Sequence, residues 1–118
     1  MMSKLEQKKK RYLQDSLPIR MGGLAANLAR VGSFVAFPKG KIAVDSLLRE
    51  SKYFIEWTAA EFVPETAAQL VDIQRKLIRW QKQIDLSWDD GTTRIDIGVE
   101  AKRLSDILLS KSGLLDTP

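Results

Sequence analysis

The sequence predicts an all-α protein, a compact bundle of five helices that forms a single domain over residues 1–118. Apolar residues recur at a period near 3.6 in every segment, and no segment sustains the period-2 alternation that marks a strand. Prolines and glycines at four places divide the chain into five such segments. The chain has about the commonest domain length and its connections are short, so neighbouring helices are expected to pack mostly antiparallel.

The first two helices have recognisable start signals. Ser3 and Glu6 have the Ser-x-x-Glu spacing of a capping box, and the helix that follows is expected to run to about Asp15. The second helix begins at Ser16-Leu17-Pro18, with the proline in the first turn, where its missing N–H loses no hydrogen bond. It is expected to end before Pro38.

The third helix is expected over roughly Ile42 to Phe62 and the fourth from Pro64 to about Asp85, and both carry ordinary core stripes. The three tryptophans are interpreted as core or subunit contacts rather than as base-stacking platforms. Ile73 and Trp80 lie seven residues apart and off the main stripe of the fourth helix. We therefore expect them to form an exposed apolar strip, the interface with a protein partner.

The fifth helix is expected to start after Thr92 or Thr93 as its cap and to end at Ser112, because Gly113 follows. Asp89-Asp90-Gly91, just before it, is interpreted as a capping turn. It lacks the alternating ligands and the distal glutamate of a calcium-binding loop.

The second helix has three distinct faces. One is an apolar seam for helix packing, formed by Leu17, Met21, Leu24, Leu28, Val31 and Val35. A second contains only small residues: Gly22, Ala25, Ala26, Ala29, Gly32, Ser33 and Ala36. Glycine inside a helix costs about 1 kcal/mol relative to alanine. Close approach by another helix, or by an extended backbone, is expected to compensate for this.

The third face of the second helix contains Arg20, Gly23, Asn27 and Arg30. Two arginines and an amide around a small residue suit a phosphodiester backbone that approaches closely while the guanidinium groups bind phosphate oxygens. The alternative is that the arginines pair with acidic residues from the fourth or fifth helix. Both interpretations remain open from the sequence.

Charge is unevenly distributed along the chain. Residues 1–44 contain nine basic and two acidic residues, a balance of +7, whereas the rest contains ten basic and thirteen acidic residues, a balance of −3. This asymmetry favours a basic surface for a polyanion, although a solvated surface is the simpler alternative. The candidate nucleic-acid-binding residues are Lys8, Lys9, Arg11, Arg20, Asn27, Arg30, Lys39 and Lys41. Their expected ligand is the backbone of RNA or of an RNA-containing duplex, bound without base specificity.

The composition excludes most enzyme classes. The chain has no cysteine and no histidine, so it lacks thiolate nucleophiles, His-dependent triads and the commonest zinc ligands. Gly22-Gly23 lacks the Gly-Lys-Ser/Thr ending of a phosphate-binding loop. We expect no catalytic residues, no metal site and no cofactor. No apolar stretch suits a membrane span and no secretory signal is visible, so a cytoplasmic protein without membrane contact is expected.

The segment from Ser16 to Ala29 (SLPIRMGGLAANLA), preceded by Lys8-Lys9-Lys10-Arg11-Tyr12, resembles the early part of the small helical subunit of type III CRISPR effector complexes. The similarity covers about residues 8–37, roughly a quarter of the chain. It implies a small, non-catalytic α-bundle that stacks in several copies inside a ribonucleoprotein filament. On this resemblance, Arg20, Arg30 and the cluster from Lys8 to Arg11 contact phosphates.

Two hypotheses follow for the function. The first is a non-catalytic scaffold subunit that binds nucleic-acid backbone as part of a larger assembly, with other protein subunits as partners. The second is a protein–protein adaptor or a self-associating bundle, a possible homo-oligomer, in which the basic residues only aid solubility.

Overall fold

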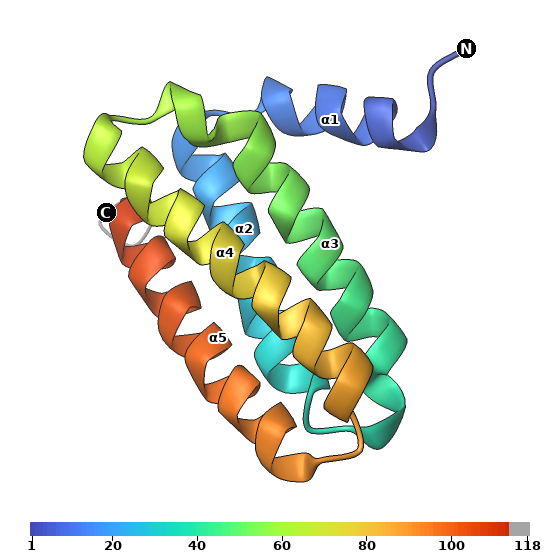
Figure 1. Ribbon diagram of the computed structural model, residues 1–118. Helices are drawn as coiled ribbons and strands as arrows, with labels where there is room; N and C mark the ends of the chain where they lie inside the picture. The colour runs from blue at the N-terminus through green and yellow to red at the C-terminus, as the bar shows by residue number, and fades with distance from the viewer. Residues whose placement is uncertain (114–118) are drawn as a thin grey trace.

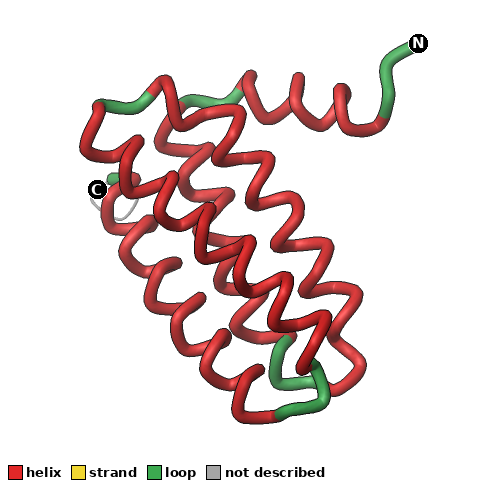
Figure 2. The backbone as a smooth tube through the Cα atoms, viewed as in Figure 1, coloured by secondary structure: helices red, strands yellow, loops and turns green. Residues whose placement is uncertain are grey.

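The structure is a computed structural model in which residues 1–113 are described, and it confirms the all-α prediction. Five α-helices follow one another with short connections, as Figures 1 and 2 show. They are α1 (Lys4–Gln14), α2 (Leu17–Phe34), α3 (Lys41–Thr58), α4 (Pro64–Ser87) and α5 (Gly91–Ser112). Two 3₁₀ turns, η1 (Pro38–Gly40) and η2 (Ala59–Glu61), precede and follow α3. Among the described residues there is no strand.

Helices α2 to α5 form an antiparallel bundle, and α1 crosses one end of it (Figure 1). Helix α2 packs most extensively against α5 and α3, and α4 packs mainly against α3. Helix α1 contacts the bundle through its C-terminal part and projects beyond it toward the N-terminus (Figure 1). The antiparallel prediction is therefore confirmed for α2 to α5, whereas α1 lies across the others.

The core follows the predicted seam of α2. Met21, Leu24, Leu28, Val31 and Val35 are all buried, together with Val44, Leu48 and Ile55 of α3. Trp80 and Trp88 are also buried, and Trp57 packs partly buried against the same core. The interpretation of the tryptophans as packing residues is consistent with these positions.

The predicted exposed strip on α4 is wrong. Ile73 is 5% exposed and Trp80 is 7% exposed, so neither offers a surface to a partner. The buried stripe of α4 consists of Leu70, Ile73, Leu77, Trp80 and Ile84, with alternating steps of three and four. This spacing keeps one seam turned toward the bundle, and it leaves Val71 and Ile78 outside.

The predicted caps Ser3 and Gly113 are found where expected, whereas the cap at the start of α5 differs from the prediction. The Ser3 side chain accepts a hydrogen bond from the Glu6 backbone N–H at 3.1 Å, which is one of the two hydrogen bonds of a capping box. Gly113 ends α5 with φ at +77°, the left-handed conformation expected there. The cap of α5 is Asp90, which accepts from the Thr92 N–H at 3.0 Å. The capping-turn interpretation is thus confirmed, whereas Thr92 or Thr93 as the cap was wrong.

Part of the small-residue face of α2 packs closely against α5, as predicted, whereas Ser33 and Ala36 of that face are exposed. A Cβ placed on Gly32 would lie 2.5 Å from Cγ of Lys102 and 3.2 Å from the carbonyl oxygen of Gly98. Further along the same contact, the Ser105 hydroxyl donates to the carbonyl oxygen of Ala25 at 2.6 Å. Helix–helix packing therefore offsets the intrinsic helix penalty of Gly32.

Candidate functional site

The predicted basic residues do not form one continuous surface. Those of α1 lie at the end of the bundle where that helix crosses, whereas Lys39 and Lys41 lie at the connection between α2 and α3, at the opposite end (Figure 1). Helix α3, which connects the two ends, has 18 residues and is therefore about 27 Å long. The two groups of cations cannot contact the same phosphates.

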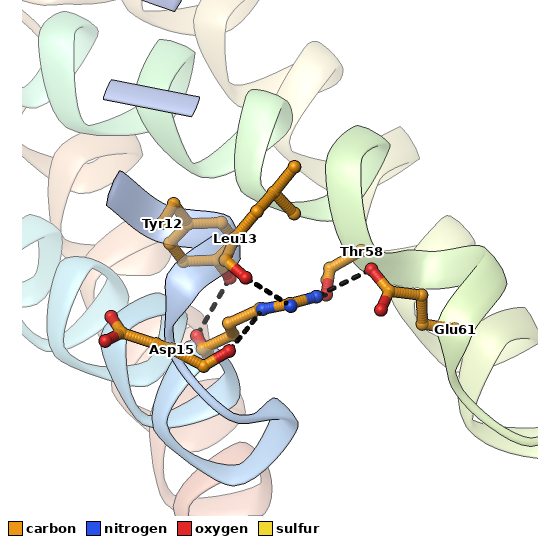
Figure 3. A network of polar contacts seen from close by, with 6 residues as sticks. Tyr12, Leu13, Asp15, Thr58 and Glu61 are labelled. Carbon is orange, nitrogen blue, oxygen red and sulfur yellow. Dashed lines mark hydrogen bonds and ion pairs between the residues drawn. The ribbon is translucent and has the colours of Figure 1, made fainter. Parts of the chain in front are cut away.

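Arg20 is buried, with 7% of its surface exposed, so it is not on an exposed basic face. Its guanidinium group donates to the carbonyl oxygens of Leu13 at 2.8 Å and Asp15 at 2.9 Å. It also donates to the Thr58 hydroxyl at 3.2 Å and to the Glu61 carboxylate at 2.6 Å (Figure 3). These partners occupy most of its donors, so the expected phosphate contact of Arg20 is corrected to a structural role.

Tyr12 explains why this part of α2 is covered. Its ring stacks on Phe54 with centroids 3.9 Å apart. Its hydroxyl donates to the carbonyl oxygen of Arg20 at 2.9 Å (Figure 3). Burial raises the pKa of Tyr12, despite the opposing charge of Arg20, so the hydroxyl remains a proton donor. The aromatic contact and this hydrogen bond hold the end of α1 against α2 and α3.

Three of the predicted residues meet around one carboxylate that the sequence did not single out. Glu50 of α3 forms an ion pair with Lys8 and accepts a hydrogen bond from the Asn27 side chain at 3.1 Å. Asn27 is 2% exposed, and its amide oxygen accepts from Arg30 at 3.3 Å. Asn27 is thus an internal bridge, which corrects its expected place on an exposed face.

The charge of Glu50 changes what this cluster can bind. Burial tends to raise its pKa, but hydrogen bonds from Lys8 and Asn27 and the nearby charges outweigh that effect, so the pKa is lowered. The carboxylate is therefore ionised at neutral pH and balances Lys8. Arg30 remains exposed at the edge of this cluster.

The partners in these pairs were not predictable from the sequence. The expectation for acidic partners considered the fourth and fifth helices, whereas the partners Glu50 and Glu61 belong to α3 and to the 3₁₀ turn that follows it. Glu50 lies one turn before Phe54 on α3. Residues four apart share a helix face. Because Phe54 contacts Tyr12, Glu50 therefore also lies beside α1.

The remaining cations of α1 form the best candidate site. Lys4, Lys9, Lys10 and Arg11, which we call the α1 cations, are all exposed. Within residues 1–113, none of them forms an ion pair, and Glu6 is the only acidic residue on the helix. Of this group, Lys9 and Arg11 were predicted as site residues from the sequence, and the resemblance implied the same for Lys10. The candidate site is therefore the exposed surface of α1 and not the predicted face of α2.

Lys39 and Lys41 form a second, smaller basic group at the other end. Lys39 is exposed and lies beside Phe34 and Phe37 around a shallow depression, and Lys41 is half-buried. Neither has an ion-pair partner in the described part of the chain. Two separated cations at this end offer a weaker site for a polyanion than the α1 cations do.

The residues that the structure describes include no group of three or more carboxylates that could hold a metal ion. None of their helices has both the length and the apolar character needed to cross a bilayer.

Comparisons of the chain with family models, with curated proteins and with solved structures found no match.

Proposed function

We propose that this protein is a non-catalytic, cytoplasmic scaffold subunit that binds nucleic-acid backbone through the α1 cations, as part of a ribonucleoprotein. The observation that carries the proposal is the projection of α1 from the bundle with four cations exposed and unpaired among the described residues. RNA, or an RNA-containing duplex, is proposed as the ligand because residues 8–37 resemble the small helical subunit of type III CRISPR effectors.

The chemistry of the α1 cations favours phosphate over base recognition. Lysine is a point charge on a flexible stem, and arginine binds phosphate oxygens with a planar fork. The single aromatic residue of α1, Tyr12, is buried, so this helix offers no surface on which bases stack. If each cation neutralises one phosphate of a single strand, log K falls with log salt with a slope of about −3.

The test compares two variants that each lose four positive charges. In the first, Lys4, Lys9, Lys10 and Arg11 are replaced by glutamine. In the matched control, the same replacement is made at Lys52, Arg79, Lys82 and Lys111, which have no ion pair in the described structure. Binding is measured by fluorescence anisotropy with a labelled single-stranded RNA and its duplex, from about 50 to 300 mM salt.

We expect the first variant to lose most of the affinity and most of the salt slope, and the control to retain the greater part of both. Equal losses in the two variants would mean that net charge, not α1, determines binding. Absence of binding by the unaltered protein at the lowest salt would overturn the proposal.

A protein–protein adaptor is the second candidate, and a specific surface supports it. At the end opposite α1, Phe37 is 60% exposed and Ile42 is 85% exposed, next to Phe34 and Ala43. Apolar side chains gathered in this way mark interaction sites on soluble proteins. Replacing Phe37 and Ile42 by serine is expected to leave RNA binding unchanged, which separates the two candidates.

A further inference from the structure

Lys8 is the one cation of α1 that has an ion-pair partner among the described residues. It lies between Lys4 and Arg11 on one face of the helix, because at 100° per residue the three fall within an arc of about 60°. Along the helix axis, Lys8 is about 6 Å from Lys4 and about 4.5 Å from Arg11. The ion pair with Glu50 therefore neutralises the central charge of a row of three.

The Glu50 carboxylate is held in place from two sides. Its Oε2 atom binds the Lys8 ammonium group, and its Oε1 atom accepts a hydrogen bond from the Asn27 amide at 3.1 Å. Asn27 is only 2% exposed, and its own oxygen accepts from Arg30, which lines the same groove along α2 as Glu50 does. Because a buried amide fixes one of its oxygens, the carboxylate cannot easily turn away from Lys8.

The groups around Glu50 are of the kinds that bind phosphate. An ammonium group, an amide N–H and, at the edge, the guanidinium group of Arg30 all donate to phosphate oxygens in nucleic-acid complexes. Here they surround a carboxylate. Glu50 is charged at neutral pH, because burial, which raises its pKa, is outweighed by the hydrogen bonds from Lys8 and Asn27. A phosphate that approaches Lys8 is repelled by this charge and has to displace the carboxylate.

We propose that Glu50 is an internal competitor of the nucleic-acid backbone, which holds Lys8 and keeps it out of the phosphate-binding surface of α1. The inference rests on the proposed function and identifies a residue that limits it. Glu50 confines the ligand to the α1 cations and makes binding weaker than the charge of this helix permits. The same carboxylate also excludes phosphate from the groove between Lys8 and Arg30.

The test compares Glu50→Gln with Glu100→Gln, each made in the otherwise unaltered chain. Glutamine keeps the shape of the side chain and an acceptor oxygen for Asn27, but it lacks the negative charge. Glu100 is a matched control, because it is held by Lys76 at 2.9 Å and by Arg103 at 2.6 Å, where α4 and α5 face each other. Its replacement removes the same charge and also releases cations, but not on α1.

Fluorescence anisotropy with the labelled single-stranded RNA, from about 50 to 300 mM salt, measures affinity and salt slope. For E50Q, we expect one more phosphate contact, which steepens the slope by about 0.7 and tightens binding about fivefold at about 0.1 M salt. Adding Lys8→Gln to E50Q is expected to return both values to those of the unaltered protein. E100Q and Lys8→Gln alone are expected to leave the slope unchanged.

The double variant also lacks the ion pair, so any loosening of α1 is common to it and to E50Q, and thermal unfolding verifies that each variant folds. The inference is overturned if E50Q and E100Q raise the affinity equally, or if the gain of E50Q persists without Lys8. Either result leaves the proposed function standing, because the unaltered protein still binds through the α1 cations. If neither the unaltered protein nor E50Q binds at the lowest salt, the proposed function and this inference both fail.

Discussion

The guanidinium group of Arg20 joins three segments that lie far apart in the sequence. The carbonyl oxygens of Leu13 and Asp15, at the end of α1, have no helical N–H to accept from, and Arg20 supplies donors to both. Its positive charge also lies at the C-terminus of α1, where the helix dipole favours a cation. Arg20 thus acts as a cap for α1 while it binds Thr58 at the end of α3 and Glu61 in η2.

Replacing Arg20 by methionine is expected to lower the free energy of unfolding by about 3 kcal/mol, because the carbonyl oxygens and Thr58 lose a charged donor. Replacing Glu61 by glutamine is expected to lower it by less than about 1 kcal/mol, because that carboxylate is half exposed. Urea denaturation measures both. Equal losses would show that the ion pair, rather than the capping of α1, provides the stability.

Individual residues of the candidate site were only partly predictable. The helical wheel correctly grouped Arg20, Asn27 and Arg30 on one face of the second helix. It carried no information on whether another part of the chain covers that face. The cover comes from Tyr12 and from Glu50 of α3, and such non-local contacts do not follow from periodicity. The residue types were therefore predicted correctly, but Arg20 and Asn27 were assigned to an exposed face although they are buried.

At the scale of the helices, the crossing of α2 and α5 determines which glycines are required. A Cβ on Gly98 would lie 2.7 Å from Cγ2 of Val35, a buried side chain that has little room to move. A Cβ on Gly23 would have Cε1 of Tyr12 at 3.9 Å as its nearest neighbour, an ordinary van der Waals contact. Both glycines lie inside helices.

We therefore expect only one of the two alanine substitutions to stabilise the protein. Gly23→Ala is expected to stabilise the protein by about 1 kcal/mol, the gain in helix propensity. Gly98→Ala gains the same amount but overpacks the crossing, which costs about 1–3 kcal/mol, so the net change is neutral to destabilising. Thermal unfolding of the two variants gives the comparison. A Gly98 variant as stable as the Gly23 variant would mean that α5 can shift away from α2 freely.

The helices themselves were largely predictable, because their signals are local. Caps such as Ser3 and Gly113, and the proline at the start of α2, act through their own neighbours. The side of α4 that enters the core was less predictable, because Val71 and Ile78 are as apolar as Ile73. Only the positions of α3 and α5 decide which of these residues enter the core.

At the scale of the whole molecule, α1 is the helix with the least stabilisation from packing against the others. It has 11 residues, and isolated helices shorter than about 12–15 residues are marginal in water. Its contacts with the bundle are concentrated near Tyr12 and Lys8. The all-α class and the antiparallel bundle were predictable from segment lengths and short connections. The direction of α1 was not, because it depends on the buried contacts of Arg20.

Hydrogen exchange is expected to separate α1 from the bundle. Amides from Lys8 to Lys10 are expected to exchange through local opening, with little dependence on low urea concentrations. Amides from Leu24 to Val31, in the centre of α2, are expected to exchange only through global unfolding, with the full urea dependence. Identical exchange free energies in both segments would contradict this and would make α1 part of the same cooperative unit.

The aromatic cluster beneath α1 has an optical consequence. Tyr12 stacks on Phe54, and Trp57 lies 6.1 Å from Tyr12 and 5.5 Å from Tyr53, whereas Trp88 donates to the carbonyl oxygen of Pro38 at the other end. Rigidly stacked rings give near-ultraviolet circular dichroism, and the emission of Trp57 depends on the ring that α1 places beside it. The molecule thus contains an intrinsic optical reporter of how its basic helix is attached, and any ligand that moves that helix changes the signal without a label.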